Sequence, residues 1–297
     1  MKELVVISGK GGTGKTSITA AFASLAQNAV LADCDVDAAD LHLVLSPKIK
    51  QEQDFSGGKQ ASIMTEKCIG CGKCAKMCRF DAITLNGPGN GLVAKTYAVD
   101  PVSCEGCKVC VEFCPVDAIS FEPAINGKWF ISDTRFGPMV HAKLGIAEEN
   151  SGKLVTQVRQ NATKLAEELE KDLVLVDGSP GIGCPVIASI ANIDASVVVV
   201  EPTLSGIHDL KRALELLEHF EIKPMVVINK YDINEENTSD LEKFCKENNI
   251  ELLGKIPFDP TVTKSMVQRT PIVEFNPDSP AAKAIIETWK RFNNLLV

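Results

Sequence analysis

A glycine-rich segment near the N-terminus has the composition of a phosphate-binding loop. Residues 4–7 form an apolar run that predicts a buried strand, residues 9–16 read GKGGTGKT, and residues 17–27 predict a helix. Glycines let backbone N–H groups curl around phosphate oxygens, and the start of the helix adds partial positive charge. We expect Lys15 to reach the β- and γ-phosphates and the Thr16 hydroxyl to coordinate Mg²⁺. The segment predicts a nucleoside triphosphate site formed by Gly9, Gly11, Gly12, Thr13, Gly14, Lys15, Thr16 and Ser17.

Carboxylates follow two further predicted strands. Residues 29–32 are apolar and lead into DCDVD, which contains Asp35, while residues 172–177 form an apolar run that ends in Asp177. Carboxylates at the carboxyl ends of strands beside a phosphate loop can hold Mg²⁺ or orient an attacking water. We therefore predict a catalytic role for Asp35 and a place in the Mg²⁺ sphere for Asp177, and Asp37 could cap the following helix. Residues 178–183 predict either a plain tight turn or a switch that senses the γ-phosphate.

Eight of the eleven cysteines form two arrays with the same spacing. Cys68-x₂-Cys71-x₂-Cys74-x₃-Cys78 recurs thirty-six residues later as Cys104-x₂-Cys107-x₂-Cys110-x₃-Cys114. This is the spacing of bacterial two-cluster ferredoxins, in which the fourth cysteine of each array serves the opposite cluster. Zinc is the competing interpretation, although structural zinc sites usually use two cysteine pairs for one ion. We predict two [4Fe–4S] sites, one with Cys68, Cys71, Cys74 and Cys114 and the other with Cys104, Cys107, Cys110 and Cys78.

The arrays lie within an internal repeat of about sixty residues. Gly70 corresponds to Gly106, and residues 81–83 correspond to residues 117–119. Arg79 stands where the second repeat has Pro115. This departure removes no ligand, but we expect it to alter solvent access or potential near the second cluster.

Composition narrows the class of protein. The chain of 297 residues is long enough to bury a large core, and its formal net charge of −8 argues against a broad nucleic-acid-binding surface. No apolar stretch has the length of a transmembrane helix, and the early strand leaves no room for a signal peptide. Clustered cysteines in such a chain indicate metal ligation in a reducing compartment. A cytoplasmic metalloprotein is predicted.

Strands and helices alternate on either side of the cysteine block. Apolar runs predict strands at 129–132, 196–200, 225–228 and 251–256, with helices at 153–171, 206–220, 240–248 and from about 279 to the end. Near-continuous apolar strands indicate a mostly parallel sheet covered by helices on both faces. Residues 47–58 lose periodicity and predict a boundary. The predicted organisation is an α/β nucleotide-binding domain at 1–60 and 122–297, interrupted by a small α+β ferredoxin-like insert at 61–121.

The order of motifs resembles a known family. GKGGTGKT, DCDVD, DGSPGIG, EPT, NKYD and IPFD occur in the order found in the deviant phosphate-loop ATPases of the MinD, ParA and Mrp type, here with an inserted ferredoxin domain. The resemblance implies that Lys10 reaches the nucleotide of a partner subunit, that Asp35 positions the attacking water and that Asp177 lies in the Mg²⁺ sphere. It further implies a base-binding role for Asn229, Pro257, Phe258 and Asp259. ATP is the expected nucleotide, and GTP stays open because residues 229–232 have the form of a guanine-reading motif.

The resemblance also implies a nucleotide-dependent homodimer. We expect ATP hydrolysis to gate electron transfer, or delivery of a cluster or metal cofactor, to an unidentified redox partner or recipient. The alternatives are a positioning ATPase whose clusters sense redox state, and an insert whose clusters only staple a partner-binding fold. The final helix is expected to dock on the sheet rather than enter a membrane. Cys184 is expected to be buried rather than an interfacial ligand, and Cys34 and Cys245 are expected to be structural.

Overall fold

The computed structural model describes residues 1–145 and 151–296, which form two compact units. The first unit comprises Met1–Gln53, Trp129–Lys143 and the chain from Ser151, and the second is formed chiefly by Asp54–Lys128. The second unit extends beyond the predicted range of 61–121 at both ends. The reason is a continuous antiparallel ladder that pairs Gly58 with Ala124 and Ile63 with Ile119.

A nine-stranded sheet organises the first unit, in the order β13-β12-β11-β1-β10-β2-β9-β8-β3. The strands from β13 to β9 pair in parallel, and near-continuous apolar sequences leave β1, β2, β10, β11 and β12 largely buried. The bounds are β1 Lys2–Ser8, β2 Ala29–Asp33, β3 Lys48–Phe55, β8 Gly127–Thr134, β9 Gly137–Leu144, β10 Leu173–Pro180, β11 Ala195–Val200, β12 Pro224–Asn229 and β13 Glu251–Ile256.

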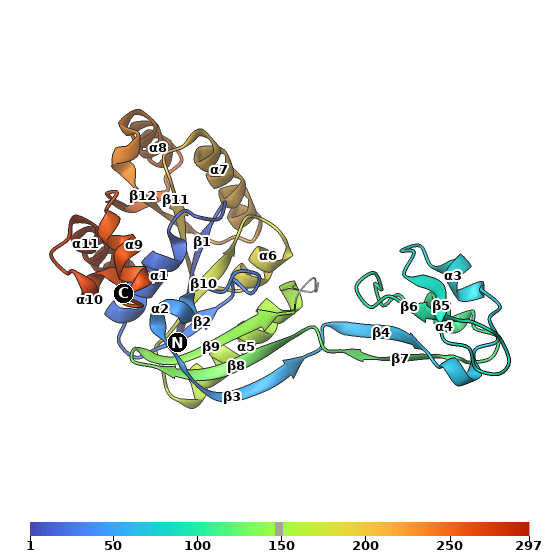
Figure 1. Cartoon of the computed structure of the whole chain (residues 1–297). Helices are drawn as coiled ribbons and strands as arrows, with labels where there is room; N and C mark the ends of the chain where they lie inside the picture. The colour runs from blue at the N-terminus through green and yellow to red at the C-terminus, as the bar shows by residue number, and fades with distance from the viewer. Residues whose placement is uncertain (146–150, 297) are drawn as a thin grey trace. The chain divides into compact units, whose positions relative to one another are not determined.

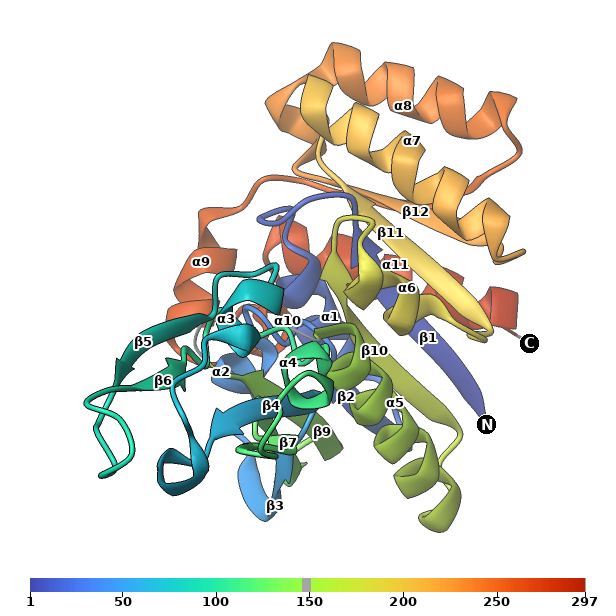
Figure 2. The same ribbon diagram turned by 90° about the vertical axis from the view of Figure 1, so that its right-hand side faces the viewer.

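Helices cover both faces of this sheet (Figure 1). One face carries α1 (Lys15–Leu25), α2 (Leu41–Leu45), α10 (Ile272–Phe275) and α11 (Pro280–Leu296), and the other carries α5 (Ser151–Glu168), α6 (Cys184–Ile190) and α7 (Leu204–His219). α8 (Glu235–Glu247) lies beside α7 in both views (Figures 1 and 2), and α9 (Pro260–Val267) follows β13. The predicted parallel sheet with helices on both faces is confirmed.

The final helix packs on the core, as predicted. Ala281, Ile285, Trp289 and Phe292 are buried, and the Trp289 ring lies 4.9 Å from that of Phe22 on α1. Its apolar stripe is therefore occupied within the fold. Among the described residues, no helix combines the length and the apolar character that crossing a membrane requires.

Two strands of the nine-stranded sheet are not predicted by the sequence patterns. The sequence predicts a boundary within residues 47–58 and no strand there, and the two units divide between Gln53 and Asp54. Lys48–Phe55 nevertheless forms β3 at the edge of the sheet, exposed except at Phe55. An edge strand that faces water on both sides shows no apolar alternation, and its lysines discourage pairing with other chains. β9 was not predicted either, although Met139, Val140 and Ala142 are buried.

The second unit contains two antiparallel two-stranded sheets and two short α-helices. β4 (Gly58–Ile63) pairs with β7 (Ile119–Ala124), and β5 (Ile83–Gly87) pairs with β6 (Thr96–Val99). α3 (Lys73–Met77) packs against α4 (Val109–Glu112), which holds the same place in the second repeat. Its buried core cluster consists of Ala61, Cys74, Ile83, Cys110 and Ile119. Two of these five residues are cysteines from the predicted ligand sets.

Candidate functional site

The glycine-rich loop follows β1, a central strand of the sheet, and leads directly into α1. Gly14 adopts a φ of 89°, and a Cβ there would come within 2.3 Å of the Asn229 amide nitrogen. Gly9 approaches Asp209 so closely that a Cβ would lie 2.5 Å from its carbonyl oxygen. The loop therefore requires glycine both for conformation and for space, as expected of a phosphate cradle.

Lys15 lies at the centre of a buried group of charges below this loop. Its ammonium is 2.9 Å from Asp177 Oδ1 and 3.4 Å from Asp35 Oδ2. Burial alone would lower the pKa of Lys15, but the carboxylates of Asp177 and Asp35 outweigh burial and raise it. Lys15 is therefore a fixed positive charge beneath the loop.

Asp177 receives two further hydrogen bonds from α1. Thr16 Oγ1 donates to Asp177 Oδ2 at 2.8 Å, and Thr19 Oγ1 donates to Asp177 Oδ1 at 3.0 Å. Thr16 and Asp177 thus present neighbouring hard oxygen atoms, the ligand type that Mg²⁺ prefers. The predicted Mg²⁺ residues lie together. The sequence did not indicate Thr19, although it lies one turn after Lys15.

Asp33 is a second buried carboxyl group that the sequence did not single out. β10, β2 and β9 place Asp177, Asp33 and His141 at matched positions across three neighbouring strands. Burial raises the pKa of Asp33 well above its ordinary range, and the nearby charge of Asp177 adds to the rise. Asp33 Oδ1 accepts from the Asp35 N–H at 3.2 Å, and Oδ2 has no partner within the described parts of the chain. Burial and the neighbouring charge of Asp177 therefore favour the neutral form of Asp33.

Lys10 extends to the start of α7 within its own chain. Its ammonium donates to Thr203 Oγ1 at 3.2 Å and to Ser205 Oγ at 3.0 Å, and Glu201 Oε2 lies 4.0 Å away. The other oxygen of Glu201 pairs with Lys230. The side chain of Lys10 retains 30% exposure, so it is the accessible lysine of the loop, in contrast to Lys15.

The residues expected to bind the base lie at two positions. Asn229 is buried and donates to the Thr13 carbonyl at 2.7 Å, so it supports the phosphate loop from below. After β13, the Phe258 N–H donates to Asp232 Oδ1 at 2.7 Å, and the Phe258 ring is 56% exposed. Pro257 precedes it, and Asp259 caps α9 by accepting from the Thr261 N–H at 2.8 Å. Among these residues, Phe258 is the side chain that can stack on a base.

The segment that follows Asp177 differs from the expected turn. β10 continues through Gly178 and Ser179 to Pro180, which pairs with Ser8, so the turn is confined to the residues after Pro180. Ser179 Oγ donates to the Cys34 carbonyl at 2.6 Å, and the Gly181 N–H donates to the Ser8 carbonyl at 2.8 Å. The strand is longer than predicted because these bonds join it to β1 and to the residue after β2.

The structure brings the eight arrayed cysteines together in two groups of four. One cavity is lined by Cys68, Cys71, Cys74 and Cys114, and the other is lined by Cys78, Cys104, Cys107 and Cys110. All eight are free thiols, and burial raises the pKa of Cys74 to about 11. The Ala118 N–H donates to Cys114 Sγ at 3.2 Å. Within the described chain, no three or more Cys, His, Asp or Glu side chains are arranged to hold a single metal ion.

The other three cysteines lie in the first unit. Cys34 and Cys245 are buried, as expected of structural cysteines, and burial raises the pKa of Cys245 to about 11. Cys184 begins α6 and is exposed, so the expectation that it is buried is wrong.

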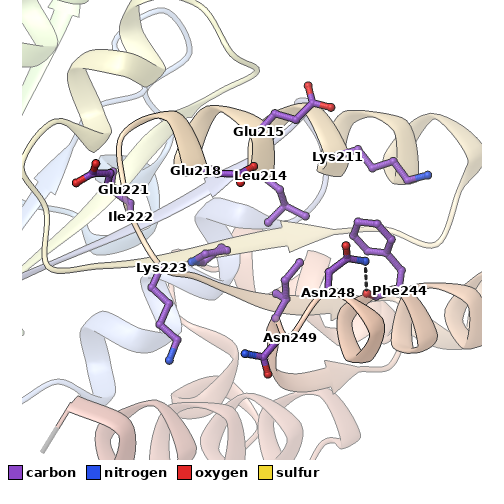
Figure 3. Close-up of a pocket in the computed structure, with 12 residues that line it drawn as sticks. Lys211, Leu214, Glu215, Glu218, Glu221, Ile222, Lys223, Phe244, Asn248 and Asn249 are labelled. Carbon is purple, nitrogen blue, oxygen red and sulfur yellow. Dashed lines mark hydrogen bonds between the residues drawn. The ribbon is translucent and has the colours of Figure 1, made fainter.

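One further cavity is remote from these groups. Its volume is about 650 Å³, and Figure 3 shows that residues of α7 lie on one side of it and that Phe244 and Asn248, at the end of α8, lie on the other. Pro224, at the amino end of β12, also lines it. The phosphate loop follows the carboxyl end of β1, and β1, β11 and β12 are parallel, so this cavity lies at the opposite edge of the sheet. It is not the nucleotide site.

Comparison with known proteins identifies the family. Residues 4–272 match the model of the CobQ/CobB/MinD/ParA nucleotide-binding domain. An uncharacterized protein of Methanocaldococcus jannaschii is 33% identical over 98% of this chain and 97% of its own. The iron–sulfur cluster carrier protein of Aquifex aeolicus is 29% identical over 40% of this chain and 36% of its own.

A solved structure shares the fold. The septum site-determining protein MinD of Pyrococcus horikoshii, complexed with Mg-ADP, superposes with a TM-score of 0.59 and 17% identity, over 99% of this chain and 97% of that one. The family match agrees with the phosphate loop, Lys15 and Asp177 of the first unit. The chain belongs to the CobQ/CobB/MinD/ParA family of phosphate-loop nucleotide-binding ATPases.

Proposed function

We propose that this chain is an ATP-hydrolysing iron–sulfur protein whose nucleotide state gates electron transfer, or delivery of a cluster or metal cofactor, through two [4Fe–4S] clusters. The observation that carries this proposal is the pair of cavities, each lined by three cysteines of one repeat and the last cysteine of the other. The similarity to an iron–sulfur cluster carrier protein supports a connection between this ATPase family and clusters.

The chemistry of the donor sets fits [4Fe–4S] clusters. Each set offers four free thiols, and the arrays have the spacing of two-cluster ferredoxins. A cubane is larger than one ion and takes a thiolate at each iron, so its ligands surround a cavity rather than converge on a point. When bound, such clusters would exchange single electrons. Cys68, Cys71, Cys74 and Cys114 would hold one, and Cys104, Cys107, Cys110 and Cys78 the other.

The nucleotide site supports hydrolysis with groups already in place. Thr16 Oγ1 and Asp177 would hold Mg²⁺, which would supply a counter-charge for the phosphates. Lys15 exchanges its ion pairs with Asp177 and Asp35 for oxygens of the triphosphate, and Asp35 then becomes free to orient water. Burial raises the pKa of Asp35, which makes its carboxylate a stronger base than that of a free aspartate. Phe258 would stack on the base.

We propose that the ATP-bound form is a homodimer in which Lys10 leaves Thr203 and Ser205 to reach the partner's nucleotide. The partial exposure of Lys10 supports this role. A positioning ATPase with redox-sensing clusters is the second candidate. The buried stripe of α11 argues against membrane attachment through that helix.

Anaerobic purification followed by iron and sulfide analysis tests the clusters. We expect about eight irons per chain, and four or fewer would contradict two [4Fe–4S] clusters. The gating is tested by cluster midpoint potentials and cluster transfer measured with ATP, with ADP and without nucleotide. Identical values in all three states would leave the positioning ATPase as the better description.

A further inference from the structure

The two cysteine repeats carry opposite charge although they share one ligand pattern. Residues 65–80 contain four basic side chains and one acid, whereas the corresponding residues 101–116 contain one basic side chain and two acids. Their formal net charges are therefore +3 and −1. The differences fall at matched positions, where Lys76 corresponds to Glu112 and Ile69 to Glu105. A requirement for cluster binding would act on both repeats equally, so it does not account for this difference.

The basic side chains of the first repeat gather around α3. Lys73, Lys76 and Met77 are spaced i, i+3 and i+4, which places them on one face of the helix, and all three are exposed. Lys67 and Ile69, on either side of Cys68, are also exposed, as is the ligand-set residue Cys71. We call Lys67, Ile69, Lys73, Lys76 and Met77 the basic rim.

The lysines of the basic rim differ in their ion pairing from the matched residues of the second repeat. No ion pair joins Lys67, Lys73 or Lys76 to a carboxylate within the described parts of the chain. At the matched place in the second repeat, Lys108 pairs with Glu112 at 2.6 Å, and the face of α4 carries Val109, Glu112 and Phe113. The uncompensated charge is thus confined to the first repeat.

We propose that the basic rim docks a small acidic redox protein, so that the cavity of Cys68, Cys71, Cys74 and Cys114 is where this chain exchanges electrons with its partner. This inference rests on the proposed function, since it assumes a cluster in that cavity. In each exchange one electron passes between the partner's cofactor and this cluster, one being oxidised and the other reduced, with no bond made or broken. Unpaired lysines steer an acidic partner, and Ile69 with Met77 supply apolar contact beside Cys71.

Nucleic acid and anionic lipid fit the rim less well. Non-specific binding to either depends on many basic groups in a continuous stripe, whereas the rim has three lysines with Glu66 beside them, in a chain of net charge −8. The exposed apolar side chains of Ile69 and Met77 match the composition of a protein interface. A compact acidic protein is the occupant that this mixture favours.

The test uses the anaerobically purified full-length protein and a flavodoxin, a small acidic flavoprotein, as the probe. Binding is measured by calorimetry at 50 mM and 300 mM salt. We expect the wild type to bind and to lose roughly tenfold in affinity at the higher salt. The variant K67E/K73E/K76E should bind at least about tenfold more weakly at low salt, with the salt dependence removed or inverted.

The control variant K164E/K243E/K290E has the same change in net charge at exposed lysines of the first unit. It should bind flavodoxin within about twofold of the wild type. The proposal is overturned if the wild type does not bind, if the rim variant binds as well as the wild type, or if both variants lose affinity equally. It is also overturned if the rim reversal instead abolishes binding to duplex DNA or to phosphatidylglycerol vesicles. Iron content distinguishes the failure of one proposal from the failure of the other. A chain that contains eight irons but does not bind flavodoxin would refute the docking proposal and leave the two-cluster proposal intact.

Discussion

The nucleotide unit and the cysteine unit are built on different kinds of core. The first unit has 27 residues in one buried cluster, nearly all of them aliphatic or aromatic, and it buries Lys15 and Asp177 only as a bonded pair. The second unit has five residues in its buried cluster, and two are the ligand-set cysteines Cys74 and Cys110. A unit of this size with so small a buried core needs a further source of stability, such as a bound metal centre. The ligand site of the first unit is thus held by its fold, whereas we propose that the fold of the second depends on the clusters proposed for its cysteines.

The largest effect that this comparison predicts is unfolding of the second unit while the first unit stays folded. Cys74→Ser should lower amide protection across Asp54–Lys128 at least roughly a hundredfold while leaving β1 and α1 protected, because Cys74 belongs to both core and ligand set. Hydrogen exchange with mass spectrometry measures both units in one experiment.

Cys184→Ser is the matched control, since Cys184 is exposed and lies in the first unit. It should leave protection unchanged everywhere. If Cys74→Ser retains protection across the second unit, that unit has a sufficient core of its own and the contrast fails.

The next effect concerns the buried ion pair of the first unit. Lys15→Ala should reduce ATP hydrolysis at least about a hundredfold, because the phosphates lose their fixed cation. It should also lower the free energy of unfolding by about 3 kcal/mol, because Asp177 loses the charge that compensates its burial. Steady-state hydrolysis and urea unfolding give the two quantities.

Lys211→Ala, at an exposed lysine of α7 that lies over the Phe244 ring, serves as the control and should leave hydrolysis unchanged and stability nearly so. If Lys15→Ala unfolds at the same urea concentration as the wild type, the hydrogen bonds from Thr16 and Thr19 are sufficient to stabilise the buried Asp177 carboxylate.

The features that the sequence predicts correctly are those set by short local patterns. The phosphate loop, Asp177 and the cysteine arrays are set by spacing within short segments, so their placement beside one another follows from the sheet and the repeat. β3 and β9 were missed because β3 is a polar edge strand and β9 has no clean alternation. The raised pKa of Asp33 depends on the register across β10, β2 and β9, and the support of Thr13 by Asn229 depends on how β12 approaches the loop. Both features depend on contacts between residues far apart in the sequence, so no local sequence pattern predicts them.

A smaller effect tests whether Lys10 acts in its own chain or in a partner. Lys10→Ala should leave ATP affinity within about twofold but slow hydrolysis roughly tenfold or more, because Lys15 still binds the phosphates. An equimolar mixture of the Lys10→Ala and Lys15→Ala variants should recover roughly a quarter of wild-type hydrolysis, since half of the dimers would contain one complete site. Hydrolysis that does not rise on mixing would place Lys10 in its own site, held by Thr203 and Ser205.

The smallest effect is the pH dependence of stability from Asp33. The pKa of Asp33 is raised in the folded chain, so its contribution to stability is fully present below the unfolded pKa and is lost as pH rises through the folded pKa. Asp33→Asn keeps a neutral group of similar shape and removes this loss. The melting temperature of the variant should therefore exceed that of the wild type by a few degrees at pH 9, and the difference should shrink toward pH 5. Calorimetry at the two pH values measures it, with Asp172→Asn at the exposed start of β10 as a control. A difference that grows toward low pH would mean that Asp33 is held charged, and the first unit would then bury a charge without a partner of its own.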